Sequence, residues 1–213
     1  LSVIDLSHAE KLQVGKSAFR GCTSLAAIDL SKADEIGDNA FDGCASLRQI
    51  GRLSGRIGSN AFADTQLSDV RYTEPNPVLR DRAFRGLKSL RRFEITGRFE
   101  SDLGAEAFEG CESLVSAGPF TAPWHFEGGW KDSCKVGCYA FSRCRSLERI
   151  SFSGAWSVSE AARLFMGCSS LGEIVLDIGG VILPTSFAED CTALKSVKCN
   201  DLFTVGERAF YGC

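Results

Sequence analysis

The sequence is poor in the residues and motifs on which most catalytic sites depend. Its 213 residues include only two histidines, His8 and His125. The HExxH, GxSxG and P-loop motifs, which mark metalloproteases, serine hydrolases and phosphate-binding enzymes, are all missing. His8 follows the first expected strand in a polar turn, where a solvated loop residue is the simplest interpretation. These absences predict a protein that is not an enzyme and that binds no cofactor.

Long apolar stretches and an excess of one charge are also lacking. No apolar run approaches the roughly 18 residues that a transmembrane helix needs. The 24 basic and 27 acidic residues give a net charge of −3, which offers no electrostatic reason to expect nucleic acid or an anionic membrane as the main partner. No Asn-x-Ser/Thr glycosylation site occurs, which mildly disfavours a glycosylated eukaryotic ectodomain. We therefore expect no nucleic-acid partner and no membrane insertion.

The sequence does contain a repeated pattern of about 23 residues. The pair Ala-Phe recurs, usually with a cysteine three residues after the Phe. A looser copy contains Ser186-Phe187, in which Cys191 comes one place late. The Phe positions are 19, 41, 62, 84, 108, 141, 165, 187 and 210. The interval from 108 to 141 is 33 residues long, whereas the others span 21 to 24, so it contains an insertion.

Each unit also has an aliphatic-Gly step before the Phe and an LxxIxL-like segment after it, as in Ile36-Gly37 and Leu147–Phe152. A unit of this size cannot bury its own hydrophobic face, whereas stacked units form one continuous core. We expect short parallel strands about 4.8 Å apart, an interior ladder of Phe rings, and glycines in turn positions with positive φ. The prediction for residues 1–213 is one β-rich α/β solenoid domain of about nine coils, with a parallel sheet on the concave face and short strands and helical turns on the convex side.

The combination IGxxAFxxCxSLxxIxL resembles the BspA-like leucine-rich repeat proteins. Residues 36–47 match that pattern closely, and the resemblance covers the whole chain. The chain departs from it where Thr65 and Leu87 occupy the Cys slot and where Glu160-Ala161 replaces the aliphatic-Gly step. The resemblance implies a horseshoe-like leucine-rich-repeat solenoid that binds other macromolecules and has no catalytic activity. It favours a cell-surface or secreted protein, some relatives being adhesins, and leaves an intracellular assembly subunit open.

Seven of the ten cysteines share the repeat slot, namely residues 22, 44, 111, 144, 168, 191 and 213. Leu87 fills the same slot, and equivalent side chains in successive coils point in parallel, which is poor geometry for a disulfide. We therefore expect buried thiols that pack as small hydrophobic groups. Cys199 also falls on an apolar strand position. Cys134 and Cys138 lie outside these core slots, so the cysteine count does not fix a redox compartment.

The insertion near residues 121–133 is rich in aromatic side chains, with Trp124, Phe126 and Trp130 around two glycines. Aromatic residues supply much of the binding energy of many interfaces, so this loop is a candidate for partner contact. Alternatively, it folds back over the solenoid where Ala117 and Pro119 weaken the preceding strand.

Three potential metal ligands lie in or beside the insertion: His125, Cys134 and Cys138. They raise the alternative of a small zinc-binding or hydrolytic domain centred on residues 124–138. Structural zinc normally takes four ligands, and no second cysteine pair accompanies this one, so we assign no metal. A local disulfide between the two cysteines, or two free thiols, are the other interpretations.

Outward positions of the expected strands supply the remaining candidates. Solenoids bind partners through their extended sheet and its rim loops. Because side chains alternate between the two faces of a strand, the exposed columns can be identified from the repeat. We predict a protein partner, bound by an adhesin-like surface module or by a subunit of a larger assembly. The predicted partner-binding residues are Arg71, Arg92, Glu94 and Arg149, together with Trp124, Phe126 and Trp130 of the loop.

The two ends of the repeat array carry no visible polar cap, although terminal repeats normally need one. The sequence starts inside an expected strand and stops at Tyr211-Gly212-Cys213, before the next one. We expect either a segment of a longer repeat protein or docking of partners onto the uncapped solenoid ends.

Overall fold

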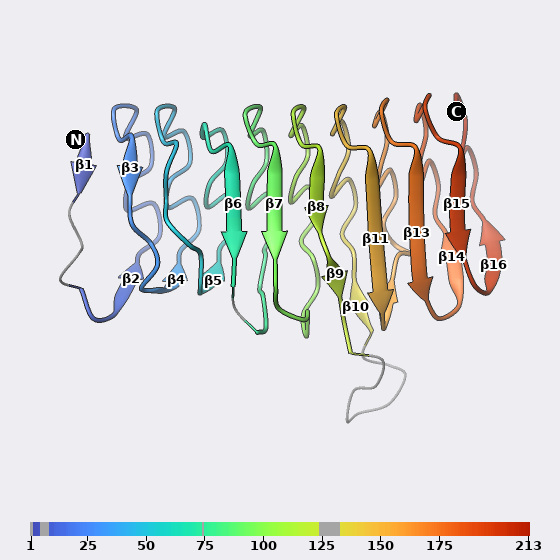
Figure 1. The fold of residues 1–213 in the computed structure, drawn as a ribbon, viewed down its shortest axis with the longest axis horizontal. Helices are drawn as coiled ribbons and strands as arrows, with labels where there is room; N and C mark the ends of the chain where they lie inside the picture. The colour runs from blue at the N-terminus through green and yellow to red at the C-terminus, as the bar shows by residue number, and fades with distance from the viewer. Residues whose placement is uncertain (1, 5–8, 74, 124–132) are drawn as a thin grey trace.

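A computed structural model shows the chain as a parallel β-solenoid (Figure 1). The structure describes residues 2–4, 9–73, 75–123 and 133–213. Its strands are β1 (Val3–Ile4), β2 (Leu12–Val14), β3 (Ala27–Ile28), β4 (Ala33–Ile36), β5 (Arg56–Ile57), β6 (Asp69–Tyr72), β7 (Arg92–Ile95), β8 (Ser116–Gly118), β9 (Phe120–Thr121), β10 (Cys134–Lys135), β11 (Arg149–Gly154), β12 (Trp156–Ser157), β13 (Glu173–Ile178), β14 (Val181–Leu183), β15 (Ser196–Cys199) and β16 (Leu202–Val205). In these residues no helix is long and apolar enough to cross a membrane.

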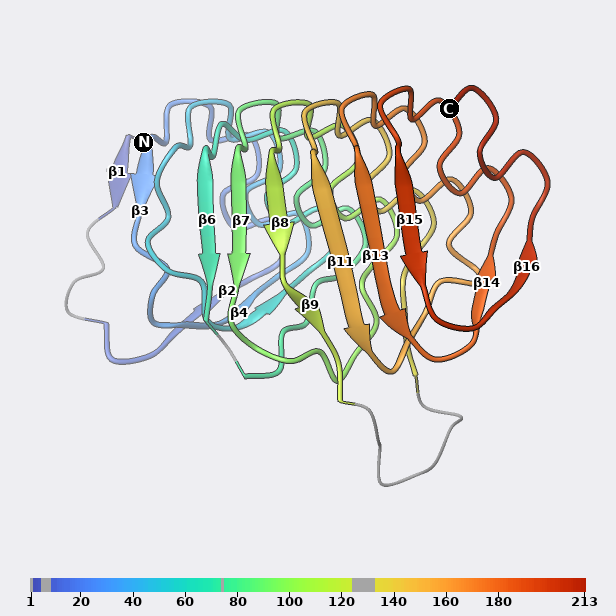
Figure 2. The ribbon, with the colours of Figure 1, turned by 45° about the vertical axis from the view of Figure 1, so that its right-hand side comes forward.

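The strands form two parallel ladders along the solenoid axis (Figures 1 and 2). The first ladder follows the predicted LxxIxL segments and contains β1, β3, β6, β7, β8, β9, β11, β13 and β15. The second ladder precedes the Gly step and contains β2, β4, β5, β10, β12, β14 and β16, with single bridges at Leu79 and Leu103. Each coil is one repeat, since Arg149 pairs with Glu173 and Glu173 with Ser196. The predicted solenoid is therefore confirmed, but it has about eight turns, whereas about nine coils were predicted.

The predicted Phe ladder runs through the core. Phe41, Phe62 and Phe84 are fully buried, and their ring centroids lie 5.3 and 5.4 Å apart in stacked geometry. Near the C-terminus, Phe187 instead meets Phe165 edge-on at 87°. The N–H of Ala188 bonds to Ala209, so Ala188, not Phe187, is aligned with Phe210. Cys191 is therefore in register, and it is Phe187 that comes one residue early.

No α-helix occurs in the described part of the chain, so the predicted helical turns are wrong. Each Phe instead sits in a short turn that contains two residues with left-handed backbone conformation. Around Phe41 these are Asn39 (φ 56°) and Gly43 (φ 70°). A residue with positive φ interrupts a right-handed helix, so two of them within five residues prevent one from forming. We call these segments the Phe turns.

The glycines of the aliphatic-Gly step do not have positive φ, contrary to our expectation. From Gly37 onward they are required because adjacent coils approach closely. A Cβ atom on Gly58 would lie 2.6 Å from the backbone nitrogen of Asp38, and one on Gly137 would lie 2.3 Å from that of Ala105. Side chains cannot fit at such distances, so the step is a backbone contact between coils.

The repeat cysteines bond the coils to one another as buried thiols. Cys44, Cys111 and Cys168 are fully buried, and each donates its S–H to the carbonyl of the Phe in the preceding coil, at 3.0, 3.1 and 3.0 Å. Burial raises the pKa of the Cys111 thiol to about 12 and that of Cys168 well above the ordinary value. The prediction of buried thiols is confirmed for these residues, whereas Cys22 and Cys199 are half-buried and Cys213 is exposed.

One prediction concerns the Gly step. Replacing Gly137 by Ala should lower the free energy of unfolding by about 1–3 kcal/mol, because the new Cβ overlaps the backbone of the preceding coil. The matched control is Gly15→Ala in the same slot, where no atom lies within 4 Å. Urea unfolding of the control should differ from wild type by no more than about 1 kcal/mol. Equal losses in both variants would contradict the role given to coil contact.

A second prediction follows from the raised pKa of Cys111. The folded chain keeps the Cys111 proton between its ordinary pKa of 9.0 and about 12, whereas the unfolded chain loses it. The stabilisation is complete below pH 9 and declines as pH rises through this window, by about 1.4 kcal/mol per pH unit. A Cys111→Thr variant, which copies Thr65 in the same slot, should therefore lose less stability than wild type between pH 8 and pH 11. Urea unfolding under reducing conditions measures this difference, and parallel pH curves for the two proteins would disprove it.

Candidate functional site

Three of the predicted binding residues lie together on the outer face of the first ladder. Arg71 is paired in register with Glu94, and Arg92 lies two residues before Glu94 on the same strand. The side chains of Arg71, Arg92 and Glu94 are 62%, 57% and 43% exposed. The alternate residues of β6 and β7 point inward and are buried. Strand alternation thus places the three charged groups outward, as predicted.

Glu94 lies between the two arginines. Its carboxylate is 3.2 Å from Nε of Arg71 and 3.7 Å from a terminal nitrogen of Arg92. Two guanidinium groups therefore share one carboxylate, which leaves donor groups unused on both arginines. A hollow of about 350 Å³ lies at this point and is lined by Gly51, Arg52, Asp69, Val70, Arg71, Arg92 and Glu94. The repeat places Gly51 in an outward column, whereas its neighbour Arg52 lies outside these columns and was not predicted.

Arg149 belongs to a different cluster on the same ladder. It lies on β11, and β8 and β9 separate it from β7. Arg149 pairs with Glu173 of β13, which also lies 2.5 Å from Lys198 of β15. Lys198 and Arg149 hold the pKa of the Glu173 carboxyl below its ordinary value. The predicted residues thus form two groups. Glu173 and Lys198 were not predicted as binding residues, although both fall in the outward columns.

The aromatic residues of the insertion, Trp124, Phe126 and Trp130, lie outside the described residues, and so does His125. Their role in partner contact stays a prediction. The described flanks show where the insertion is attached: it connects β9 of the first ladder with β10 of the second (Figure 2). The preceding strand is interrupted at Pro119, since β8 pairs with β7 whereas β9 pairs with β11. The predicted weak point before the insertion is therefore present.

Cys134 belongs to the core, which corrects its placement outside the core slots. Its side chain is 3% exposed, and its thiol bonds to the carbonyl of Phe99 in the preceding coil at 3.4 Å. The thiol of Cys138 bonds to the carbonyl of Glu160 in the following coil at 3.0 Å. Both are free thiols that bond in opposite directions along the axis. Within the described residues, no group of three or more His, Cys, Asp or Glu side chains could hold a metal ion.

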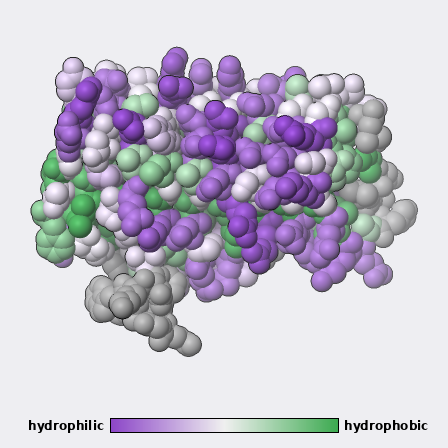
Figure 3. Space-filling model, turned by 180° about the vertical axis from the view of Figure 1, so that it is seen from behind, coloured by the Kyte–Doolittle hydropathy of each residue, from purple (hydrophilic) through white to green (hydrophobic). Residues whose placement is uncertain are grey.

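The C-terminal end of the second ladder exposes apolar side chains. Leu202, Phe203 and Val205 of β16 are 46%, 72% and 51% exposed. Seen from behind, hydrophobic residues gather at this end, whereas the middle of the face is mostly hydrophilic (Figure 3). Sequence periodicity does not distinguish β16 from an inner strand, because its apolar positions match those of the other units. Docking of a partner onto this end stays a prediction.

The chain is similar to a known repeat family and to three solved bacterial proteins. The BspA type leucine-rich repeat region matches residues 3–115 and 131–213, in six copies. A leucine-rich repeat protein from Bacteroides ovatus is 21% identical, with a TM-score of 0.42, over 95% of this chain and 68% of that one. The leucine-rich repeat protein of T. pallidum is 22% identical, with a TM-score of 0.41, over 95% and 70%.

A leucine-rich cell surface protein from Faecalibacterium prausnitzii is 16% identical, with a TM-score of 0.44, over 98% of this chain and 74% of that one. Among curated proteins, none matches this sequence. The family match extends over nearly all of the chain and agrees with the repeat, the two ladders and the Phe turns. The chain belongs to the BspA-type leucine-rich repeat family.

Proposed function

We propose that this chain is a non-catalytic protein-binding module that holds its partner on the outer face of the first ladder. The cluster of Arg71, Arg92 and Glu94 carries this proposal, because it gathers three exposed charged side chains around a hollow. The strands beneath it are fixed by hydrogen bonds to the coils on both sides. A preorganised array of this kind binds with little loss of conformational entropy.

The chemistry of this cluster favours a partner with carboxylate groups. Arginine presents a planar fork of donors that matches a carboxylate, and Arg71 and Arg92 have donors left over after bonding to Glu94. The existing pairs are exposed to solvent, and such pairs contribute only about 0–1 kcal/mol each. An acidic side chain of the partner can therefore replace Glu94 at low cost.

The insertion and the Arg149 cluster extend the proposed surface along the ladder. Trp124, Phe126 and Trp130 are the residue types that anchor interfaces, and their insertion begins directly after β9. Strand β9 pairs with β11, which begins with Arg149. We propose that the loop supplies apolar contacts and that the two charged clusters set the orientation of the partner. An adhesin-like surface module and a subunit of a larger assembly would use this face in the same way.

The alternative of a zinc or hydrolytic domain at residues 124–138 has less support. Its two cysteines bond to carbonyl groups in different coils, and Cys134 is buried. A metal ion would have to break both of these contacts to bind the two thiols together.

The proposal predicts that losing two charges on this face abolishes partner capture. Immobilised wild-type protein and an Arg71→Gln/Arg92→Gln variant would be exposed to the same cell extract, and bound proteins would be quantified by mass spectrometry. The control is Arg20→Gln/Arg85→Gln, which removes the same charge from the Phe-turn side, where both residues form ion pairs at 2.9 Å. We expect a discrete set of proteins on wild type and control that falls at least about tenfold on the face variant.

A further variant that lacks residues 124–132 should also capture less of this set. Identical capture by all four proteins would contradict the proposed face. Stoichiometric zinc in the purified protein that disappears in a Cys134→Ser/Cys138→Ser variant would favour the metal-binding alternative.

A further inference from the structure

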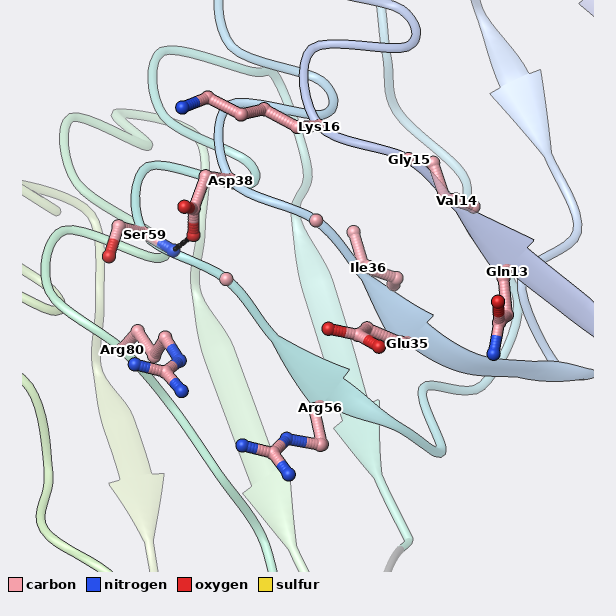
Figure 4. A pocket seen from close by; sticks show the side chains of 12 residues that line it. Gln13, Val14, Gly15, Lys16, Glu35, Ile36, Asp38, Arg56, Ser59 and Arg80 are labelled. Carbon is pink, nitrogen blue, oxygen red and sulfur yellow. Dashed lines mark hydrogen bonds between the residues drawn. The ribbon is translucent and has the colours of Figure 1, made fainter.

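The second ladder carries a groove whose floor has no side chains. Gly15, Gly37 and Gly58 occupy the same slot in three successive coils, and the coils approach so closely that Gly37 and Gly58 cannot carry a Cβ atom. These three glycines line a hollow of about 520 Å³ (Figure 4). In the fourth coil the slot after Leu79 holds Arg80, whose side chain closes this end of the groove. The glycines that allow the coils to approach each other therefore also leave a groove that is large enough for a ligand.

Two arginines stand at the closed end of this groove. Arg56 projects from β5 and Arg80 from the next coil, and Figure 4 shows both side chains at the same end of the hollow. Both are exposed, and neither makes an ion pair with the described residues. Arg56, Ser59 and Arg80 also line an adjoining hollow of about 370 Å³. The pair is thus accessible from two sides.

Two carboxylates that flank this end of the groove hold the coils together. Asp38 accepts the backbone N–H of Ser59 at 2.8 Å, and Asp81 accepts that of Ala105 at 2.9 Å. Glu35 is the in-register neighbour of Arg56 but forms no ion pair with it in the described structure. The two guanidinium groups therefore keep their donors for a ligand.

The charge of the chain around this site contrasts with the rest of the molecule. Residues 48–98 contain 11 basic and five acidic residues, whereas the remainder contains 13 basic and 22 acidic residues. Away from its arginine end, however, the groove is lined by two carboxylates, Glu35 and Asp38, and by one cation, Lys16. A long polyanion such as a nucleic acid would be repelled there, while a ligand with charges of both signs would match both ends.

We propose that this groove binds an extended peptide that places an acidic side chain on Arg56 and Arg80 and a basic side chain near Glu35. Arginine pairs bind carboxylates with directed hydrogen bonds, and a floor without side chains admits a polypeptide backbone. Glu35 and Arg80 lie two coils apart, which is about 10 Å at about 4.8 Å per coil. An extended chain covers that distance in about three residues. The expected motif therefore has one basic and one acidic residue three positions apart, in either order. This site is separate from the first-ladder face and does not depend on it.

The test uses the peptide acetyl-Lys-Gly-Ser-Glu-amide and its neutral analogue, in which Gln replaces both charged residues. Titration of the isotope-labelled protein should produce saturable NMR shifts of the Nε–H signals of Arg56 and Arg80 with the charged peptide and not with the analogue. An Arg56→Gln/Arg80→Gln variant should bind roughly three- to tenfold more weakly, since each exposed ion pair contributes modestly. The control Arg91→Gln/Arg98→Gln removes two other exposed arginines that form no ion pair with the described residues, and it should bind like wild type.

Three results would overturn the proposal. The first is equal binding by the groove variant and the control variant. The second is a shift of all exposed arginine signals to the same extent, which would indicate unspecific screening. The third is tighter binding of a heparin oligosaccharide than of the peptide at equal ionic strength, which would identify a polyanion site. Because Arg71 and Arg92 remain in every protein used here, none of these results bears on the first-ladder face.

Discussion

The close approach of successive coil backbones determines most features of this molecule. Hydrogen bonds between coils bring Gly58 so near to the preceding turn that a Cβ atom would lie 2.6 Å from a backbone nitrogen. The same approach lets the thiols of the inner repeats reach the carbonyl of the Phe in the preceding coil, as Cys111 does at 3.1 Å. It also stacks the rings of the Phe turns, with Phe62 and Phe84 at 5.4 Å. Glycine, cysteine and phenylalanine thus recur because each fills one place in the contact between coils.

This contact also determines where binding groups can stand. Side chains that do not pack between coils point outward in columns, and their neighbours in the column come from adjacent repeats. Arg71 and Glu94 are 23 residues apart in the sequence but side by side on the first ladder. Arg56 and Arg80 line one groove on the second ladder, beside Gly37 and Gly58, which have no room for a Cβ atom. Two binding surfaces of different chemistry therefore arise from the same stacking.

The repeat made the solenoid, the parallel strands, the Phe ladder and the buried thiols predictable, because each depends on residue types that recur within one unit. Features that depend on the neighbouring coil were not predictable in the same way. The Gly step was assigned to a turn conformation when its cause is contact, and Cys134 was placed outside a core that it joins through Phe99. Because the interval that contains the insertion is 33 residues long, Cys134 could not be aligned with a position of the repeat from the sequence. The arginine in the Gly slot at residue 80 was the one signal in the sequence for the second groove.

Photo-cross-linking from the first ladder tests most directly whether the protein holds a partner on this face. A benzoylphenylalanine residue in place of Ser116, the in-register neighbour of Arg92, would lie on the outer face of β8, whereas one in place of Arg85 would lie on a Phe turn. After irradiation in a cell extract, we expect a discrete cross-linked protein from position 116 and none from position 85. The same cross-linked product from both positions, or one from position 85 alone, would contradict the assignment of partner binding to the first ladder.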